Sequence, residues 1–252
     1  MARRQRLDAE LVRRNLVDSR AAAERAISEH RVLVNGAVAD KPARQVHAGD
    51  AIVLQGDPPR FVSRGGEKLD AALAAFGIDV SGCRVLDAGA STGGFTDCLL
   101  QRGAAHVVAL DVGHGQLHPR IREDARVQVL ERFHVRDVTP DAIGGQVDLV
   151  TADLSFISLT RVIPAMVGVL VGDGAMVLLV KPQFEAGRVE VSRGHGVITD
   201  PAIHTRVCQE VEAALVAAGC AVRQWVDSPI TGGDGNREFL VHAVSERSGF
   251  PA

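Results

Sequence analysis

The chain has 252 residues, of which 46% are hydrophobic and 23% charged, a balance typical of a folded globular protein of one or two domains. Aromatic residues make up only 4% and tyrosine is absent, which argues against an RNA platform of stacked aromatic side chains. The net charge of −3 hides an asymmetry, because residues 1–70 carry 13 basic and 10 acidic residues, a net of +3, and the remainder carries −6. A basic N-terminal region favours contact with a polyanion.

The first 58 residues predict a small α+β domain. Apolar residues at helical spacing predict a helix over 7–17 with Asp8 as its N-cap, and Ser19 precedes a second helix over 20–29. A strand over 31–36 ends in an Asn-Gly turn, and another strand follows at 49–54. The proline and glycine residues of 56–59 indicate a linker, which we place at 59–65.

Residues 66–252 predict a second, larger domain in which strands and helices alternate. Strands are predicted at 83–87, 106–111, 127–130, 147–152, 175–180, 222–226 and 239–244, and helices at 94–101, 159–170 and 202–218. Alternation on this scale indicates an α/β fold with a doubly wound, mostly parallel Rossmann-like sheet. The most apolar stretch, 162–180, is interrupted by Asp173 between two glycines, so no membrane span is predicted.

The N-terminus and the cysteines indicate a cellular compartment. Residues 1–6 lack the apolar segment of a secretory signal. The four cysteines show neither C-x-x-C spacing nor histidines at zinc-finger spacing. We therefore expect a cytoplasmic protein with reduced thiols and no metal site.

Acidic residues end two of the predicted strands. Asp87 is followed by a glycine-rich turn, Gly89 to Gly94, that opens a helix, and glycines allow a backbone to approach a ligand closely. The turn lacks the lysine of a triphosphate-binding loop, and Asp87 favours a ligand with positive charge, such as S-adenosylmethionine. Asp111 ends the next strand, at a position that suits a carboxylate accepting ribose hydroxyls.

The chain has 25 arginines but only three lysines, Lys41, Lys68 and Lys181. Arginine stays protonated at any working pH, whereas lysine can serve as a base. Asp153 and Lys181 end neighbouring predicted strands and are expected to meet across the sheet; a helix N-cap is the alternative for Asp153. Glu238 enters the last strand, where a surface salt bridge is the simpler explanation.

These motifs resemble a known family. The N-terminal residues resemble the αL-type RNA-binding module first described in a ribosomal small-subunit protein; those that match are Arg6 to Asp8, Leu11-Val12, Leu16-Val17, Ser19-Arg20, Ala23, Ile27, Val32 to Gly36, Lys41-Pro42 and Gly49-Asp50. Residues 61–245 resemble FtsJ-like methyltransferases. Together, with the junction Phe61 to Leu69, the chain resembles the TlyA family, whose members are described both as rRNA 2′-O-methyltransferases and as haemolysins.

The resemblance implies a set of functional residues. A catalytic tetrad falls on Lys68, Asp153, Lys181 and Glu238. Contacts with S-adenosylmethionine fall on Asp87, Gly89, Ser91, Thr92, Gly93, Gly94, Phe95 and Asp111, with His134 or Asp137 as alternatives for the adenine edge. The candidates for rRNA phosphate contacts are Arg3, Arg4, Arg6, Arg13, Arg14, Arg20, Arg25 and Arg31.

The resulting hypothesis is methylation of a ribose 2′-hydroxyl in ribosomal RNA, with a cytidine as the expected target, rRNA in ribosomal subunits as partner, and neither DNA nor a membrane involved. Lys181, beside cationic Lys68, would accept the hydroxyl proton, while Asp153 and Glu238 position the lysines and the ribose. Three alternatives stay open at this point: a ribosome-binding factor without catalysis, a membrane-active haemolysin, and a base methyltransferase.

Overall fold

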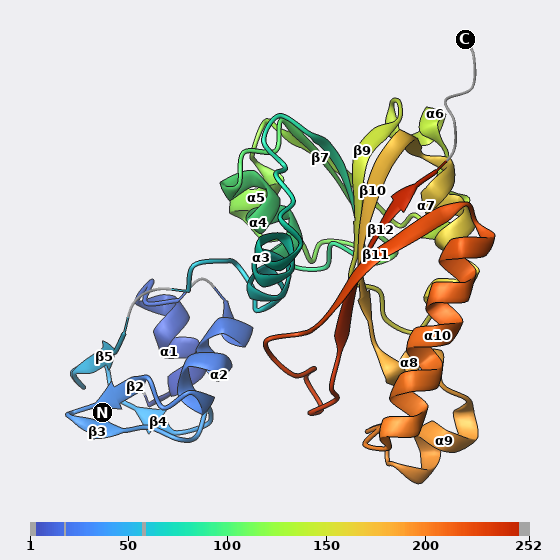
Figure 1. The fold of residues 1–252 in the computed structure, drawn as a ribbon. Coiled ribbons are helices and arrows are strands. Elements are labelled where there is room, and N and C mark those ends of the chain that lie inside the picture. Colours follow the sequence, from blue (N-terminus) through green and yellow to red (C-terminus); the bar gives the residue numbers. More distant parts are fainter. Residues whose placement is uncertain (1–3, 18, 57–58, 247–252) are drawn as a thin grey trace. The chain divides into compact units, whose positions relative to one another are not determined.

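A computed structural model describes residues 4–17, 19–56 and 59–246 of the chain. It contains two compact units, residues 1–59 and residues 60–252, whose helices and strands are labelled in Figure 1. Each unit encloses buried apolar side chains of its own, so each is described by itself.

The N-terminal unit combines two helices with short strands. Its elements are β1 (Gln5–Arg6), α1 (Leu7–Arg13), α2 (Arg20–Ser28), β2 (Val32–Val34), β3 (Ala37–Val38), β4 (Gln45–Val46) and β5 (Ile52–Leu54). β1 pairs with β4, and β2 lies between β3 and β5 in a second antiparallel sheet. Leu7, Leu11 and Ile27 from the helices form one core with Val32 and Val34 of β2.

The structure corrects one N-terminal prediction and explains two others. Arg6, not Asp8, holds the N-cap position of α1, and Asp8 lies in the first turn with its side chain fully buried. Ser19 caps α2, because its Oγ accepts a hydrogen bond from a backbone N–H at 3.1 Å. Asn35 and Gly36 both have positive φ and join β2 to β3 as a hairpin.

A seven-stranded sheet forms the centre of the C-terminal unit (Figure 1). Its strands are β6 (Arg84–Ala88), β7 (His106–Asp111), β8 (Val127–Glu131), β9 (Val147–Ala152), β10 (Leu170–Val180), β11 (Cys220–Asp227) and β12 (Phe239–Ser245). Their order is β11-β12-β10-β9-β6-β7-β8. The pairs from β10 to β8 are parallel, whereas β12 is antiparallel to both β10 and β11. The predicted doubly wound, mostly parallel sheet is therefore confirmed.

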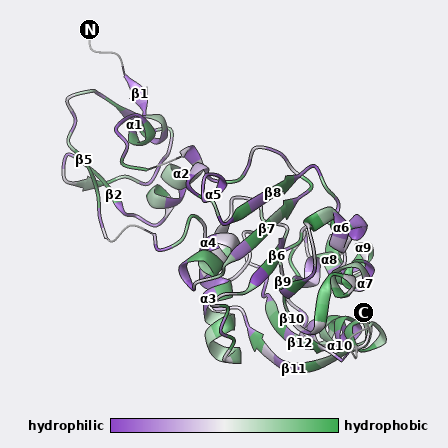
Figure 2. Cartoon of the chain, turned by 90° about the horizontal axis from the view of Figure 1, so that it is seen from above, coloured by the Kyte–Doolittle hydropathy of each residue, from purple (hydrophilic) through white to green (hydrophobic). Residues whose placement is uncertain are grey.

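Helices cover both faces of this sheet. The α-helices are α3 (Gly65–Phe76), α4 (Gly94–Gln101), α5 (Pro119–Arg122), α6 (Pro140–Ile143), α7 (Ile163–Gly168), α8 (Pro182–Glu185), α9 (Arg188–Arg193) and α10 (Pro201–Ala217), with 3-10 helices η1 (Val135–Asp137) and η2 (Leu159–Arg161). Met176 and Leu178 of β10 belong to the core that contains α7 and α10 residues, and Val177 and Leu179 to the core that contains α3 and α4 residues. Figure 2 accordingly shows β10 as largely hydrophobic, as expected for a strand buried on both faces.

Helix α3 is the main element that the sequence did not predict. It follows the expected linker directly, and its buried Leu69 and Leu73 pack in the same core as α4. Phe61 is buried in that core as well, and Val62 N donates a hydrogen bond to Asp97 Oδ2 at 2.8 Å. Most of the expected linker, 59–65, is thus bound to the C-terminal unit.

The region of the predicted helix 159–170 is also different. It consists of η2 and the short α7, with Pro164 in the first turn of α7, where the missing N–H of proline is tolerated. β10 continues through Asp173, with an irregularity between Leu170 and Ala175.

Candidate active site

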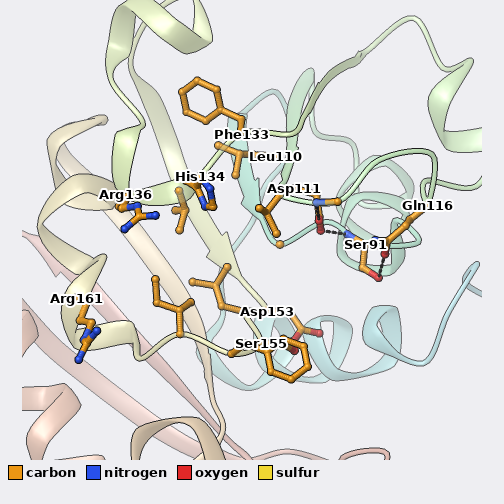
Figure 3. Close-up of a pocket in the computed structure, with 17 residues that line it drawn as sticks. Ser91, Leu110, Asp111, Gln116, Phe133, His134, Arg136, Asp153, Ser155 and Arg161 are labelled. Atoms are coloured by element: carbon orange, nitrogen blue, oxygen red, sulfur yellow. Dashed lines mark hydrogen bonds between the residues drawn. The ribbon is translucent and has the colours of Figure 1, made fainter.

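A cavity of about 630 Å³ lies at the carboxyl ends of the parallel strands (Figure 3). Gly89 and Ser91 line it from the turn after β6, residues 111–113 from the end of β7, residues 133–136 from the segment after β8, and residues 153–157 from the segment after β9. Ligands of doubly wound sheets collect at this edge. The volume suits a small-molecule site.

The turn after β6 brings its backbone close to the end of β9. Gly89 has a φ of +84°, and a Cβ at this position would lie 2.5 Å from the carbonyl oxygen of Asp153. Gly93 has a φ of +94° at the N-cap of α4, where a Cβ would lie 2.9 Å from Leu117. Both positions require glycine, so the glycine-rich motif is explained by close backbone approach.

Asp111 is fixed on the cavity wall by two backbone donors. Ser91 N donates to its Oδ2 at 2.8 Å, and Gly113 N donates to its Oδ1 at 2.6 Å. Gln116 lies beside it, and its side-chain Oε1 accepts a hydrogen bond from Ser91 Oγ at 3.4 Å. A carboxylate held in this way still has lone pairs for further donors, such as a pair of hydroxyl groups.

Asp87 lies beneath the cavity and is not among the residues that line it. Its side chain is fully buried and accepts hydrogen bonds from Thr96 Oγ1 at 2.6 Å and Thr151 Oγ1 at 3.4 Å. Burial raises the pKa of Asp87 to about 7, and the nearby charge of Asp153 adds to that effect. The carboxyl group therefore ties β6 to α4 and β9.

The other predicted cofactor residues fall into two groups. Phe95 is buried in the core, and a Cβ at Gly94 would clash with the side chain of Ser63. Both residues therefore support the conformation of the turn without facing the cavity. Four of the predicted residues line the cavity, namely Gly89, Ser91, Asp111 and His134; the others, Asp87, Thr92, Gly93, Gly94, Phe95 and Asp137, do not.

Two lysine–carboxylate pairs follow from the ends of the central strands, and one of them includes Asp153, which lines the cavity. Lys181 follows β10, and its Nζ forms an ion pair with Asp153 Oδ1 and donates to Ser155 Oγ at 3.3 Å. Lys68 of α3 donates from Nζ to Glu238 Oε2 at 2.5 Å, and these two side chains are only 9% and 2% exposed.

Sheet register explains how the two pairs come together. Val180 of β10 is paired with Phe239 of β12, so Lys181 and Glu238 occupy the adjacent positions on neighbouring strands. Asp153 directly follows β9, the parallel neighbour of β10 on the other side. The structure thus gathers all four predicted tetrad residues, whose chemical roles remain predictions.

Sequence reasoning missed the aromatic group at this site. Phe156 lines the cavity, is 93% exposed, and has a φ of +65°. Its ring centroid lies 5.3 Å from that of Phe184, which also faces Lys181 Nζ at 5.8 Å. An aromatic residue three positions after a strand-end aspartate, in a chain with few aromatics, was the available signal.

A carboxylate in α8 holds the loop that carries Phe156. Glu185 accepts hydrogen bonds from Ser158 Oγ at 2.5 Å and from Leu159 N at 2.9 Å. Burial raises the pKa of Glu185. Its contacts anchor the segment between β9 and η2.

In the N-terminal unit, Asp8 holds two of the predicted RNA-binding arginines. Arg6 and Arg20 each donate from Nη2 to Asp8 Oδ2 at 2.8 Å. Hydrogen bonds from Arg6 and then Arg20 lower the pKa of Asp8, against its burial. The two arginine side chains are still 45% and 60% exposed, so they can also meet phosphates.

Glu10 accepts hydrogen bonds from a second pair of the predicted RNA-binding arginines, and one of these arginines has further partners. Arg13 Nη2 and Arg14 Nε donate to Glu10 Oε1 at 2.6 and 2.7 Å, and the hydrogen bond from Arg13 is the main cause that lowers the pKa of Glu10 to about 2. Arg14 also donates to the carbonyl oxygens of Asp50 and Ala48 at 2.8 and 2.9 Å. The guanidinium of Arg14 therefore makes its hydrogen bonds within the folded unit.

The other predicted RNA contacts are spread over the unit. Arg4 Nε donates to His47 Nε2 at 3.1 Å, and Arg31 Nε donates to the Gln55 carbonyl at 2.9 Å. Arg25 lies on α2, and Arg3 falls outside the described residues.

Comparison with known proteins places both units. Residues 61–244 match the FtsJ-like methyltransferase family, and residues 5–52 match the S4 domain. The chain is 52% identical over 242 residues to the 16S/23S rRNA (cytidine-2′-O)-methyltransferase TlyA of Mycobacterium tuberculosis, covering 96% of this chain and 90% of that protein. It is 39% identical to Hemolysin A of Brachyspira hyodysenteriae, covering 95% and 99%. A solved structure from Streptococcus thermophilus, described provisionally as a hemolysin, has a TM-score of 0.77 at 40% identity and covers 99% and 91%.

Two further features bear on the alternatives. Within the ranges that the structure describes, no helix has the length and apolar character needed to cross a membrane. Cys83, Cys98 and Cys208 are free thiols, and burial raises the pKa of Cys98 to about 12 and that of Cys208 to about 11.

Proposed function

Since the chain belongs to the FtsJ-like methyltransferase family, and to its TlyA-type members with an N-terminal S4 domain, we propose that it methylates the 2′-hydroxyl of a cytidine ribose in ribosomal RNA with S-adenosylmethionine as donor. The observation that carries the proposal is the Lys181–Asp153 ion pair at the edge of the strand-end cavity. We further propose that the enzyme acts in the cytoplasm, where ribosomal subunits are found.

The cavity fits the proposed methyl donor. Asp111, held by backbone amides, offers its carboxylate to ribose hydroxyls, and Leu110, Val112 and Phe133 offer apolar surface to an adenine ring. Glycine at position 89 allows the turn to pass close to the Asp153 carbonyl at the cavity wall. When bound, the donor supplies the electrophilic methyl group.

The lysines and carboxylates accept the hydroxyl proton and position the reacting groups. A ribose hydroxyl must lose its proton as it becomes a nucleophile, and Lys181 Nζ is placed to accept that proton in its neutral form. Asp153 and Ser155 fix Nζ in position. Lys68, held by Glu238 at the adjacent strand position, adds a buried positive charge that orients the ribose.

RNA would be held by both units. The exposed guanidiniums of Arg6 and Arg20 are suited to phosphates, and their shared carboxylate keeps them close together. Phe156 at the cavity mouth offers a flat face on which the base of the target nucleotide can stack. An assembled tetrad beside a cofactor-sized cavity favours catalysis over a role in binding alone.

The direct test is transfer of a labelled methyl group to purified ribosomal subunits, followed by alkaline digestion of the RNA. A 2′-O-methyl group removes the hydroxyl that alkaline cleavage needs, so label in alkali-resistant dinucleotides, with cytidine on the 5′ side, is expected. Label in mononucleotides would instead assign the methyl group to a base, and absence of label from both subunits would refute the proposed function.

A further inference from the structure

Two arginines line the cavity at the end away from the glycine turn. Figure 3 shows Arg136 and Arg161 on the side opposite Ser91 and Gln116, with Asp153 between the two ends. Both side chains are exposed, and among the residues that the structure describes, neither guanidinium has a carboxylate partner.

Most other arginines of this unit are neutralised by a carboxylate. Those with such a partner are Arg60, Arg102, Arg120, Arg122, Arg126, Arg206, Arg223 and Arg237. The exposed Arg64 and Arg132 also lack one within the described ranges, but they do not line the cavity. Unpaired guanidiniums at a cavity wall indicate a site for an anion that arrives with a ligand.

The backbone under each arginine is fixed before any ligand binds. Arg136 lies in η1, between the buried side chains of Val135 and Val138. Arg161 ends η2, whose first turn is tied to Glu185 through Leu159 N at 2.9 Å. Placement on anchored turns lowers the entropy that binding would otherwise cost.

The charges at the two ends of the cavity differ in sign. Asp111 gives the glycine-turn end a carboxylate, which suits hydroxyl donors and repels phosphate. Asp153, in the middle, is neutralised by Lys181. The arginine end is therefore the part of the cavity where a phosphodiester would be attracted.

We propose that Arg136 and Arg161 form a phosphate-binding subsite for the RNA strand, which takes the backbone phosphates that flank the methylated ribose. This inference rests on the proposed function, because it assigns part of the same cavity to the RNA backbone. The catalytic unit then binds the RNA strand directly, independently of the arginines of the S4 domain, and this binding is the same in the ground state and the transition state.

The test compares the full-length wild-type chain with Arg136→Ala, Arg161→Ala and the double variant. The control is Arg223→Ala, which removes a charge that is also exposed from β11, on the far edge of the sheet. Steady-state methylation of purified ribosomal subunits is measured over a range of salt concentrations, and the Kd for S-adenosylmethionine is measured by calorimetry. Filter binding of 16S and 23S rRNA transcripts supplies a readout that needs no turnover.

In the double variant we expect KM for the subunits to rise about 10- to 100-fold at moderate salt, with kcat and the cofactor Kd within about threefold of wild type. The slope of log KM against log salt concentration should fall by about 0.7 to 0.9 for each phosphate that is no longer neutralised by an arginine. Arg136→Lys/Arg161→Lys keeps both charges and should restore most of that slope, whereas Arg223→Ala should match wild type.

Two outcomes would overturn the subsite. One is unchanged KM, salt slope and transcript binding in the double variant. The other is a cofactor Kd that weakens as much as KM, which would assign the arginines to the carboxylate of the methyl donor. If wild type methylated neither subunit, the proposed function would fail, and equal transcript binding by wild type and the double variant would then decide against the subsite separately.

Discussion

The carboxylates of the S4 unit and those of the proposed tetrad have different partners. In the S4 unit, Asp8 and Glu10 are buried against arginines, two for each carboxylate. In the methyltransferase unit, Asp153 and Glu238 of the proposed tetrad each meet a lysine, Asp87 accepts hydrogen bonds from the hydroxyls of Thr96 and Thr151, and the buried Asp97 meets Arg120. The difference is one of chemistry, because both units have arginines available.

The contrast between arginine and lysine partners separates charges that stabilise the fold from charges that can take part in proton transfer. A guanidinium stays charged and presents several donors in a fixed plane, so it suits a permanent frame and phosphate recognition. A lysine amine can lose and regain a proton. The chain has three lysines, and two of them lie in the tetrad, so lysine occurs where proton transfer is proposed.

Replacing lysine by arginine at position 181 is the strongest test of the comparison. Lys181→Arg keeps the charge beside Asp153 but removes the only proposed base, so we expect kcat to fall at least about 1,000-fold, within the range of general base catalysis. The Kd for S-adenosylmethionine should stay within a few-fold. Single-turnover methyl transfer and calorimetry check the two expectations.

The matched control is Lys41→Arg, which makes the same exchange at an exposed site in the S4 unit. It should leave the rate of methyl transfer unchanged. Near-normal single-turnover rates in Lys181→Arg would remove Lys181 from the role of base.

The Lys68–Glu238 pair tests whether a buried lysine is present for stability or for chemistry. Lys68→Met leaves Glu238 buried without a partner and should lower the free energy of unfolding by about 3 to 5 kcal/mol. The double variant Lys68→Met/Glu238→Leu removes both charges and should recover most of this loss, yet remain inactive. Urea unfolding followed by fluorescence of Trp225, the single tryptophan, reports on this unit alone. Recovery of activity together with stability would make the pair purely structural.

The site could be predicted from sequence only where chain order and sheet order agree. β9 and β10 are consecutive parallel strands, so the meeting of Asp153 and Lys181 follows from strand alternation. Glu238 occupies the position adjacent to Lys181 because the last strand, β12, inserts antiparallel between β10 and β11, and no local pattern encodes that insertion.

The sequence also could not distinguish a lining carboxylate from a buried one. Asp87 and Asp111 both end a strand before a glycine, yet only Asp111 lines the cavity. Asp87 is drawn inward by hydroxyls from α4 and β9, which are brought together only in the folded sheet. Asp8 was misplaced for the same reason, since its arginine partners lie on β1 and α2.

Asp87 predicts a pH dependence opposite in sign to that of the S4 unit. Its folded-state pKa of about 7 lies above its unfolded value near 4, so its contribution to stability is complete below pH 4 and is lost as pH rises through 7. Between pH 5 and 8, wild type should lose about 3 kcal/mol relative to Asp87→Asn, as measured by Trp225 fluorescence in urea. Asp8 and Glu10, with lowered pKa values, instead lose their contribution as pH falls below about 4. Parallel pH profiles for wild type and Asp87→Asn would contradict the assignment.

The smallest expected effect comes from the reverse exchange in the S4 unit. Arg14 joins Glu10 to the carbonyl oxygens of Asp50 and Ala48, and its planar fork makes these bonds at once. Lysine at this position keeps the charge but cannot reach all three acceptors, so Arg14→Lys should cost about 1 kcal/mol. Faster amide hydrogen exchange in α1, with unchanged Trp225 fluorescence, is the expected result. Arg13→Lys, which alters a guanidinium that among the described residues contacts Glu10 alone, should change exchange less. Equal effects of the two variants would mean that charge, not fork geometry, stabilises this unit.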